Sequence, residues 1–229
     1  MRLRIALLAC LLCPSPAHAA PTARFTWQLE TLAGCYRAVS DQYVEDGANV
    51  GIGVTGLAEP FTACALDLEI AAPDGRPLPD AWRYDEGGCR GPAGVSWKTH
   101  VSPGSPCGWL YDFASNPVPT TAITFDGTRL RLALLLEVGA PADPFPSGET
   151  LVAIARLSSP ENDGCDGAHE PTCFLLRSLR FRRPDGSWFE ADRPVPVITL
   201  NAAALDGPAA CSAVPARAAT WGGMKGMYR

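Results

Sequence analysis

Seven cysteines beyond residue 19 are the side chains whose chemistry is easiest to assign: Cys35, Cys64, Cys89, Cys107, Cys165, Cys173 and Cys211. In an exported chain such thiols oxidise to disulfides by default. We predict a bond between Cys89 and Cys107, which flank a predicted strand, and a bond between Cys165 and Cys173, which close a short loop. Cys35 and Cys64 form the third predicted pair, and the odd number leaves Cys211 over.

Histidine-based catalysis finds little support in the sequence. Only His100 and His169 lie beyond residue 19, and neither sits in a motif that would orient it. Pro171 follows the His169-Glu170 pair, so the helix of an HExxH zinc site cannot form there. Ser105 is followed by proline, which excludes the strand-to-helix turn of a GxSxG nucleophile. We therefore predict no catalytic residue and place His100 on a solvated strand face.

The acidic stretch from residue 161 to residue 170 (ENDGCDGAHE) is the first place to look for a metal ion. Calcium prefers carboxylate oxygens, and Asp163, Asp166 and Glu170 are the candidate ligands. The spacing of these three residues does not match that of an EF-hand loop. The paired CxxC spacing of structural zinc sites is missing around the second candidate set, Cys165, Cys173 and His169. We predict a polar turn closed by a disulfide, with no metal and no cofactor.

Four arginines form a basic cluster near the end of a predicted strand: Arg177, Arg180, Arg182 and Arg183. We predict a solvated sheet face on which they pair with nearby acids, an arrangement that contributes little to stability. Strand alternation would place Arg180 and Arg182 on the face that carries Phe174 and Leu176.

Aromatic side chains suggest a second kind of site. Trp109 and Tyr111 could form a stacking platform for sugar rings, although packing in the core is the favoured interpretation. Trp97 alternates with valines and is predicted to lie in the core.

The elements that would hold these residues are organised around a predicted hairpin between Thr121 and Val138. Asp126-Gly127 separates two alternating apolar runs, and Asp-Gly is the strongest short-range signal for a two-residue hairpin loop. That loop pairs Phe125 with Thr128 and Ile123 with Leu130. One face then carries the core residues Ile123, Phe125, Leu130, Leu132, Leu134, Leu136 and Val138, and the other carries Thr124, Arg129, Arg131 and Glu137.

Further short strands are predicted at 25–30, 61–70, 95–101, 109–113, 150–157, 174–182, 188–190 and 195–200. The Gly-rich stretch 32–56 is predicted to be a long surface excursion. No amphipathic helices intervene between these strands. The pattern predicts an all-β fold, an antiparallel β-sandwich of jelly-roll or immunoglobulin-like type stabilised by disulfides.

The start of the chain has the features of a secretory signal peptide. Arg2 and Arg4 precede a short apolar run, and Ala17-His18-Ala19 matches an A-x-A cleavage site. We expect a signal peptide over residues 1–19, a single sandwich domain over 20–201, and an Ala/Pro linker with a tail over 202–229. The protein is therefore expected to be secreted, either periplasmic or extracellular, with no transmembrane segment.

Charge limits the class of partner. Loss of Arg2 and Arg4 reduces 19 basic residues to 17 against 24 acidic ones, a net charge of −7. Nucleic acid is excluded as a partner, because binding it requires a basic surface. A carbohydrate or a component of the cell envelope fits the predicted exported sandwich better.

The order of several motifs resembles a group of uncharacterised secreted bacterial proteins. These motifs are the PLPDAW stretch 77–82, Gly88-Cys89-Arg90, the later cysteines, and the tail TWGGMKGMYR from Thr220 to Arg229. The tail, of the form TWGxxKxxYR, is the most specific part of the resemblance. The resemblance implies export, disulfides and a shared tail, and it implies no reaction.

The favoured hypothesis is a non-catalytic, exported β-sandwich that acts as a binding or cell-envelope structural module. The alternative is a secreted hydrolase, active on glycans for example, whose carboxylates converge only in the folded protein. Candidates for such a set are Asp80, Asp85 and Glu86.

Overall fold

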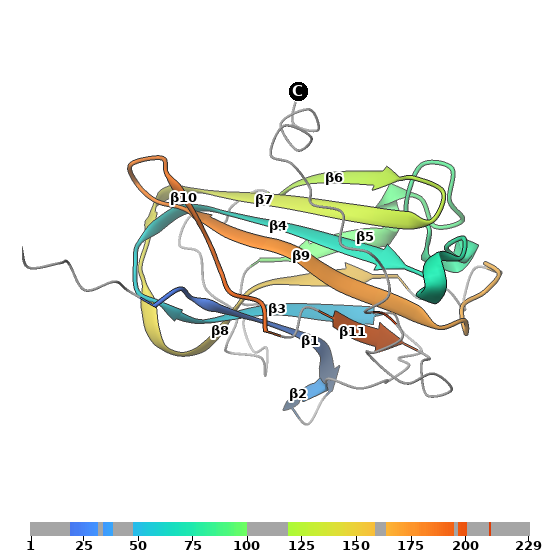
Figure 1. Ribbon diagram of the computed structural model, residues 1–229, viewed down its shortest axis with the longest axis horizontal. Coiled ribbons are helices and arrows are strands. Elements are labelled where there is room, and N and C mark those ends of the chain that lie inside the picture. Colours follow the sequence, from blue (N-terminus) through green and yellow to red (C-terminus); the bar gives the residue numbers. More distant parts are fainter. Residues whose placement is uncertain are drawn as a thin grey trace, which may run out of the picture.

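In the computed structural model, two antiparallel β-sheets pack face to face (Figure 1). The structure describes residues 19–31, 34–38, 48–99, 119–158, 164–194, 197–200 and 211. Sheet A has the order β2 (Gly34–Ala38), β1 (Thr22–Thr31), β3 (Ala48–Leu57), β8 (Phe145–Leu157), β5 (Val95–Lys98). Sheet B has the order β10 (Trp188–Glu190), β9 (Thr172–Arg182), β4 (Phe61–Ala71), β7 (Arg129–Ala142), β6 (Pro119–Phe125), and β11 (Val197–Leu200) also pairs with β9. The predicted all-β antiparallel sandwich is confirmed.

The core lies between the two sheets and is built from strand alternation. Sheet B contributes one face of β4 and β7, on which Leu68, Ile70, Leu130 and Leu132 are all fully buried. Sheet A contributes inward-facing residues of β1, β3 and β8, including Phe25, Val50, Ile52, Val54 and Ala153. Alternate residues of every long strand thus meet the opposite sheet, as expected for a sandwich.

The predicted hairpin is present, with its loop two residues longer than predicted. Phe125 pairs with Leu130 and Ile123 pairs with Leu132. Asp126 Oδ1 accepts hydrogen bonds from the Thr128 and Arg129 backbone N–H groups, at 3.0 and 2.9 Å, and this side-chain bonding stabilises the wider loop. A shift of two residues keeps every side chain on its predicted face, because the strand period is two.

The segment predicted as a surface excursion, 32–56, contains two strands. In β3 the sequence ANVGIGVTGL alternates buried Val50, Ile52 and Val54 with glycine or polar residues. A Cβ on Gly53 would lie 2.6 Å from Glu149 Oε1, the movable end of a side chain on the neighbouring strand. High glycine content therefore did not mark a loop here, because alternation of the buried valines and isoleucine formed a strand.

A β-bulge changes the predicted faces of β9. Asp67 pairs with Ser178 and Leu68 pairs with Leu176, which leaves Arg177 as the extra residue. After the bulge the core positions are Leu179 and Phe181, both fully buried. The prediction that Arg180 and Arg182 share a face with Phe174 and Leu176 is therefore wrong, since these arginines lie on the outer face.

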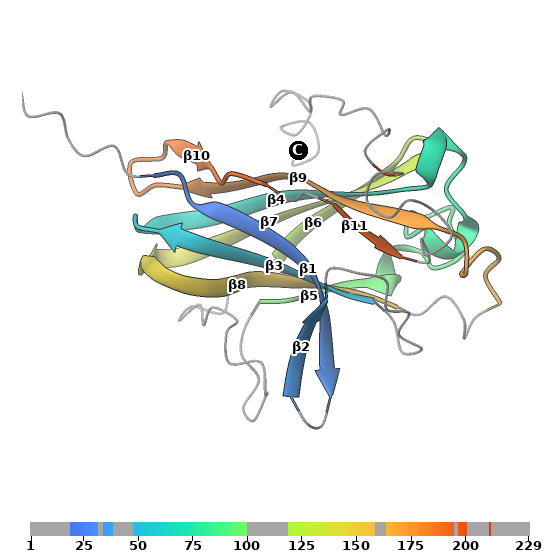
Figure 2. The same cartoon turned by 60° about the horizontal axis from the view of Figure 1, so that its bottom comes forward.

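The two long sides of the sandwich differ. On one side Ala23 N–H donates to the Asp192 carbonyl at 2.6 Å, and Asp192 N–H donates to the Pro21 carbonyl at 2.7 Å, so backbone hydrogen bonds join the sheets. On the other side each sheet ends in an edge strand, β5 in sheet A and β6 in sheet B (Figures 1 and 2). No pairing joins β5 to β6 within the described residues, and we call this side the open edge of the described sandwich.

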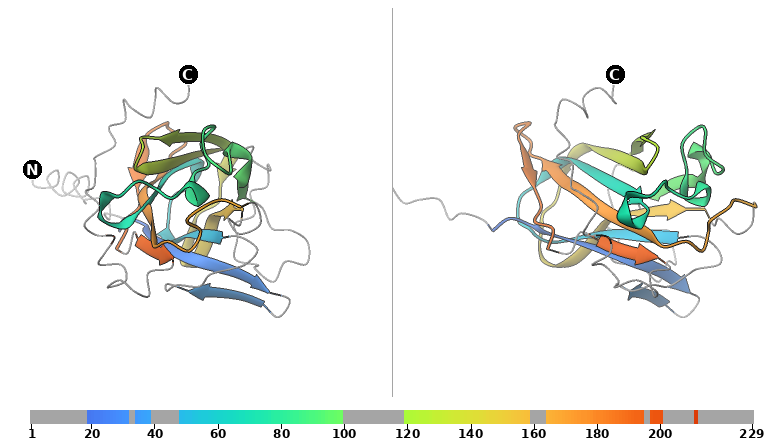
Figure 3. Two further views of the ribbon diagram at one scale, coloured as in Figure 1. Left: turned by 90° about the vertical axis from the view of Figure 1, so that its right-hand side faces the viewer. Right: turned by 45° about the vertical axis from the view of Figure 1, so that its right-hand side comes forward.

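Residues 72–94 cover one end of the sandwich, and we call them the end cap (Figure 3). The end cap contains three short 3₁₀ turns, η2 (Pro73–Gly75), η3 (Asp80–Trp82) and η4 (Pro92–Gly94). It inserts Trp82 and Tyr84 into the core, where the Trp82 ring meets Phe174 edge-on at a centroid distance of 5.5 Å. The stretch 78–82 contains Pro79 and forms no strand.

Two disulfides are present, with partners that differ from the predicted ones. Cys89 bonds to Cys165, and Cys173 bonds to Cys211. The predicted pairs Cys89–Cys107 and Cys165–Cys173 are therefore wrong. Both observed bonds join cysteines far apart in the chain, with a separation of 76 residues for Cys89–Cys165 and 38 residues for Cys173–Cys211.

The remaining cysteine assignments also change. Cys211 is paired, against the prediction that it is left over, and Cys64 is a buried free thiol, so the Cys35–Cys64 pair is wrong as well. Burial raises the pKa of Cys64 to about 12, which leaves it unreactive. The side chains of Cys35 and Cys107 lie outside the described residues.

Non-reducing peptide mapping is expected to recover two linked peptide pairs, one through Cys89 and Cys165 and one through Cys173 and Cys211. Loss of the longer-range bond in Cys89→Ser should lower the free energy of unfolding by about 2–5 kcal/mol, because the crosslink restricts the unfolded chain. Cys64 should react with iodoacetamide only after denaturation, which serves as the internal control. Recovery of a Cys165–Cys173 link would contradict this pairing.

Candidate functional site

A hollow lies at the open edge of the sandwich, and we call it the edge cleft. It has a volume of about 550 Å³. One wall comes from the inner face of β6, and the other comes from the end cap and the start of β5. Its lining residues are Thr121, Ile123 and Phe125 on the first wall and Asp85, Glu86, Gly87, Pro92 and Val95 on the second.

The apolar floor of the edge cleft is part of the core that the open edge leaves incompletely covered. Val95, Ile123 and Phe125 pack against the main hydrophobic core, yet each remains partly exposed. Neighbouring inner-face positions such as Leu130 and Leu132 are fully buried. Covering an apolar surface of this kind removes it from water, which is energetically favourable.

Arg83 holds the two walls of the cleft together. Its guanidinium donates to Asp85 through Nε and Nη2, at 3.1 and 2.8 Å, and to Asp80 through Nη1 at 3.3 Å. The same guanidinium lies over the Phe125 ring, with its central carbon 4.4 Å from the ring centroid. The end cap is thus tied to the β6–β7 hairpin by a cation–π contact and a fork of charged hydrogen bonds.

The carboxylates proposed for the alternative hydrolase do approach one another, since Asp80 and Asp85 share Arg83. Hydrogen bonds from Arg83 hold the pKa of Asp85 below its usual value. A pair of catalytic carboxylates needs one member with a raised pKa to act as the acid, and Asp85 is shifted in the opposite direction. Asp85 therefore acts as a fixed negative charge, while Glu86 is an exposed carboxylate at the cleft mouth.

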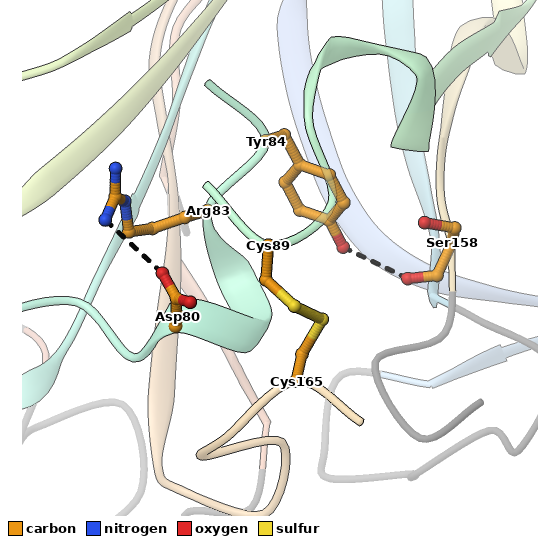
Figure 4. Close-up of a disulfide and its surroundings, with 6 residues drawn as sticks. All are labelled: Asp80, Arg83, Tyr84, Cys89, Ser158 and Cys165. Atoms are coloured by element: carbon orange, nitrogen blue, oxygen red, sulfur yellow. Dashed lines mark hydrogen bonds and ion pairs between the residues drawn. A yellow bond between two sulfur atoms is a disulfide. The ribbon is translucent and has the colours of Figure 1, made fainter. Parts of the chain in front are cut away.

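The end-cap wall is fixed from behind, as Figure 4 shows. The Cys89–Cys165 bond ties the wall to the 164–171 loop, and Tyr84 Oη donates to the Ser158 carbonyl at 3.2 Å. A Cβ on Gly94 would lie 2.8 Å from Tyr84 Cδ1, so the backbone passes this ring closely. The wall is therefore held in place before any ligand arrives, which lowers the entropic cost of binding.

A second group of charged residues lies on the outer face of sheet B, and we call it the outer charge network. At its centre Glu69 is fully buried. Arg177, the bulge residue of β9, donates to both Glu69 oxygens at 2.7 and 3.1 Å. Arg129 and Arg131 of β7 lie 3.5 and 3.6 Å from the same carboxylate. Asp67 and Glu69 both lie opposite the apolar face of β4, and both are buried.

Asp67 is the second buried acid of the outer charge network. It is 3% exposed, and its Oδ1 atom has no hydrogen-bond partner among the described residues. Burial raises the pKa of Asp67, and the negative charge of the nearby Glu69 raises it further. The positive charges of Arg131, Arg177 and Arg180 act in the opposite direction. The network is a structural feature of a sheet face and does not line the edge cleft.

The predicted pairing of the basic cluster with acids is confirmed for three of its members. Arg177 pairs with Glu69, Arg182 pairs with Glu137 at 3.1 Å, and Arg183 pairs with Glu59. The face is more buried than predicted, because Arg177 is only 14% exposed in its side chain.

The 164–170 loop, which contains candidate metal ligands, connects to the rest of the protein through a disulfide, an ion pair and a backbone hydrogen bond. Cys165 and Cys173 are both in disulfides with other partners, so neither offers a thiolate to zinc. Glu170 lies 3.5 Å from Arg76, and the Asp166 carbonyl accepts from Ala81 N–H at 3.0 Å. His169 is exposed on a turn. No cluster of three or more metal-binding side chains occurs in the described part of the chain.

Other predicted residues fall in different places. Trp97 is partly buried against the core, in line with its predicted position. His100, Trp109, Tyr111, Asp163 and the C-terminal tail 220–229 lie outside the described residues. Sequence reasoning named Asp85 and Glu86 but missed Val95, Ile123 and Phe125 as site residues, since alternation marks them only as core.

No protein-family model matches the chain, and no curated protein matches it. Among solved structures it is similar to the second type II cohesin module of the adaptor scaffoldin ScaA of Acetivibrio cellulolyticus, with 9% identity, a TM-score of 0.40, and coverage of 76% of this chain and 91% of that chain. It is also similar to a cohesin module from a family 33 glycoside hydrolase of Clostridium perfringens, with 8% identity, a TM-score of 0.39, and coverage of 80% and 97%. Because these identities and TM-scores are low, the function of this chain has to be inferred from its own residues.

Among the described residues, no helix has the length and hydrophobicity needed to cross a membrane.

Replacement of Glu69 tests the outer charge network. Glu69→Gln should lower the free energy of unfolding by about 3 kcal/mol, because it leaves clustered arginines without their shared buried counter-charge. The matched control is Glu59→Gln, which breaks a half-exposed pair with Arg183 and should cost less than about 1 kcal/mol. Urea denaturation of both variants measures the difference, and equal effects would contradict the buried role of Glu69.

Replacement of Asp67 tests the electrostatic cost of its burial. Because the folded pKa is raised, its contribution to stability is full below the unfolded value of about 3.9 and is lost as pH rises through the folded value. Asp67→Asn removes that loss, so its stability relative to the parent should increase between about pH 3.5 and pH 7. Urea denaturation at both pH values checks the trend, and a relative decrease toward pH 7 would show that attraction to the arginines dominates.

Proposed function

We propose that the chain is an exported, non-catalytic binding module whose ligand occupies the edge cleft. The observation that carries this proposal is the partly exposed apolar floor of Val95, Ile123 and Phe125 at the one long side where no pairing closes the described strands. Surfaces of this type on an otherwise well-packed protein mark interaction sites.

The charges around the cleft support binding over hydrolysis. Asp80 and Asp85 are both engaged by Arg83, and the lowered pKa of Asp85 keeps it ionised. The cleft lining includes Asp85 and Glu86 and no basic residue. Arg83 offsets only one of the two carboxylates that it contacts, so the mouth of the cleft keeps a net negative charge, with Glu86 as its exposed carboxylate. This charge favours a ligand with a positive group beside an apolar part.

The cleft suits such a ligand better than a carbohydrate. Phe125 is the one aromatic residue in its lining, and the Arg83 guanidinium already covers a face of that ring. A sugar-binding platform needs an uncovered ring face for stacking. The cell-envelope component considered above is therefore better sought among cationic, partly apolar molecules.

Export is part of the proposal and has two sources of support. The first 19 residues have the pattern of a signal peptide. The Cys89–Cys165 and Cys173–Cys211 bonds fit an oxidising compartment, where disulfides persist.

Amine fragments test the edge cleft directly. Hexylamine and phenethylamine should shift the methyl resonances of Ile123 and Val95 in NMR spectra of the labelled protein, because the amine faces Glu86 and the apolar group covers the floor. Hexanoate, which has the same apolar chain and the opposite charge, is the control and should bind at least about fivefold more weakly.

Variants separate a cleft effect from a general one. Ile123→Ser should abolish the fragment shifts, whereas Ile198→Val, a change in the buried core away from the cleft, should retain them. Absence of amine-induced shifts at Ile123, or equal binding of hexanoate, would overturn the proposed site.

A further inference from the structure

We infer that the partner at the edge cleft is an extended peptide segment of another protein, which adds as a strand to the free edge of β6 and directs a Lys or Arg side chain to Glu86. This inference rests on the proposed function, because it names the class of ligand for the same cleft. Its basis is the coincidence of backbone and side-chain directions along β6.

The hairpin loop sets the direction of the β6 backbone groups. Asp126 N–H donates to the Arg129 carbonyl at 3.1 Å, and residues 126 and 129 are the next pair beyond Phe125 and Leu130. In an antiparallel ladder, hydrogen-bonded and non-hydrogen-bonded pairs alternate. Residues 124, 122 and 120 therefore direct their N–H and C=O groups toward β7, while the intervening residues direct theirs away from it.

The intervening residues are Thr121, Ile123 and Phe125, the same three that line the edge cleft. Their backbone groups point along the sheet toward the open edge, and their side chains point toward the cleft. A strand laid beside β6 would thus form main-chain hydrogen bonds with these three residues. Its own alternate side chains would lie over the apolar floor, which is how β-strand addition combines affinity with specificity.

β6 and the short strand β11 have no charged residue, unlike the other edge strands of the described sheets. The β6 sequence PTTAITF has no charged residue, whereas the edge strands β2, β5 and β10 contain Arg37, Lys98 and Glu190. Natural proteins usually place charges or prolines on exposed edges to prevent pairing with another chain. Here the only proline is Pro119, at the first position, so six consecutive residues can pair.

Charge selects a basic peptide over a second copy of this chain. Self-pairing through β6 would bring an uncharged strand to the mouth of the cleft and leave Glu86 without a partner. It would also bring together two molecules that each have a formal net charge of −5, or −7 without the first 19 residues. A peptide with one Lys or Arg among alternating apolar residues removes both costs.

Two seven-residue fluorescein-labelled peptides, TVTKTVT and TVTETVT, provide the probes for fluorescence anisotropy, because strand alternation places their charged residue on the same face as both valines. The lysine peptide should bind at least about tenfold more tightly than the glutamate peptide, and Glu86→Lys should reverse that order. One version of the lysine peptide is N-methylated at its odd-numbered residues and another at its even-numbered residues. One of the two versions should lose binding and the other should keep it, because only one set of peptide N–H groups faces β6.

A pair of variants at one position tests the β6 edge itself. Thr121→Pro removes an outward N–H group without removing a hydrogen bond to β7, so the protein should stay folded and lose peptide binding by at least about tenfold. Thr121→Val keeps the N–H group and the β-branched shape, and it should retain binding. Circular dichroism and thermal melting of both variants confirm that the fold is intact.

The outcomes distinguish this inference from the proposed function. Retained peptide binding in Thr121→Pro, or an N-methylation pattern without alternation, would overturn strand addition even if the amine fragments bind in the cleft. Failure of both peptides to bind, with the fragments still bound, would overturn the peptide as partner. A wild-type dimer that Thr121→Pro converts to a monomer, seen by sedimentation and unaffected by the lysine peptide, would assign β6 to self-association and overturn the inference as well.

Discussion

Insertion of Trp82 and Tyr84 into the end of the sandwich is the constraint on which the rest of the site depends. Both rings are at most 1% exposed, and burial of side chains this large stabilises the fold by roughly 2–3 kcal/mol each. Arg83 lies between them in sequence, so burial of its neighbours forces it outward, toward Asp80, Asp85 and the Phe125 ring. The Cys89–Cys165 bond then fixes the far end of the same segment. The position of one cleft wall follows from the packing of two aromatic rings.

The outer face of sheet B shows a different solution to burial. Glu69 and Asp67 occupy positions where alternation predicts solvent, yet long arginine side chains from β7 and β9 cover Glu69. Alternation from the inward-facing Phe174 and Leu176 places Arg177 on this face, and the bulge at Arg177 brings Arg180 and Arg182 to the same face. Such a buried network costs desolvation and is held by geometry, so it fixes the register of three neighbouring strands more than it adds stability.

The edge cleft joins two properties that usually occur apart. A sandwich that is hydrogen-bonded along one long side by the Ala23–Asp192 pairing leaves its other side with an incompletely covered core. On β6 the residues that show this apolar surface also carry the outward backbone groups, because both properties alternate with a period of two and the hairpin loop sets their phase. Binding of an extended segment would satisfy both at once.

The sequence by itself determined the layered all-β fold, the β6–β7 hairpin and the faces of β4 and β7, because these depend on local alternation and turn chemistry. It also identified Asp80, Asp85 and Glu86 as a possible group. It did not determine the Cys89–Cys165 and Cys173–Cys211 pairing, since nothing local distinguishes one distant cysteine from another. Only the tertiary structure decided that Val95, Ile123 and Phe125 stay partly exposed, that Arg83 engages two of the carboxylates, and that one added residue in β9 reverses its faces. Each of these depends on which strands become neighbours, and that is set by packing between residues far apart in the chain.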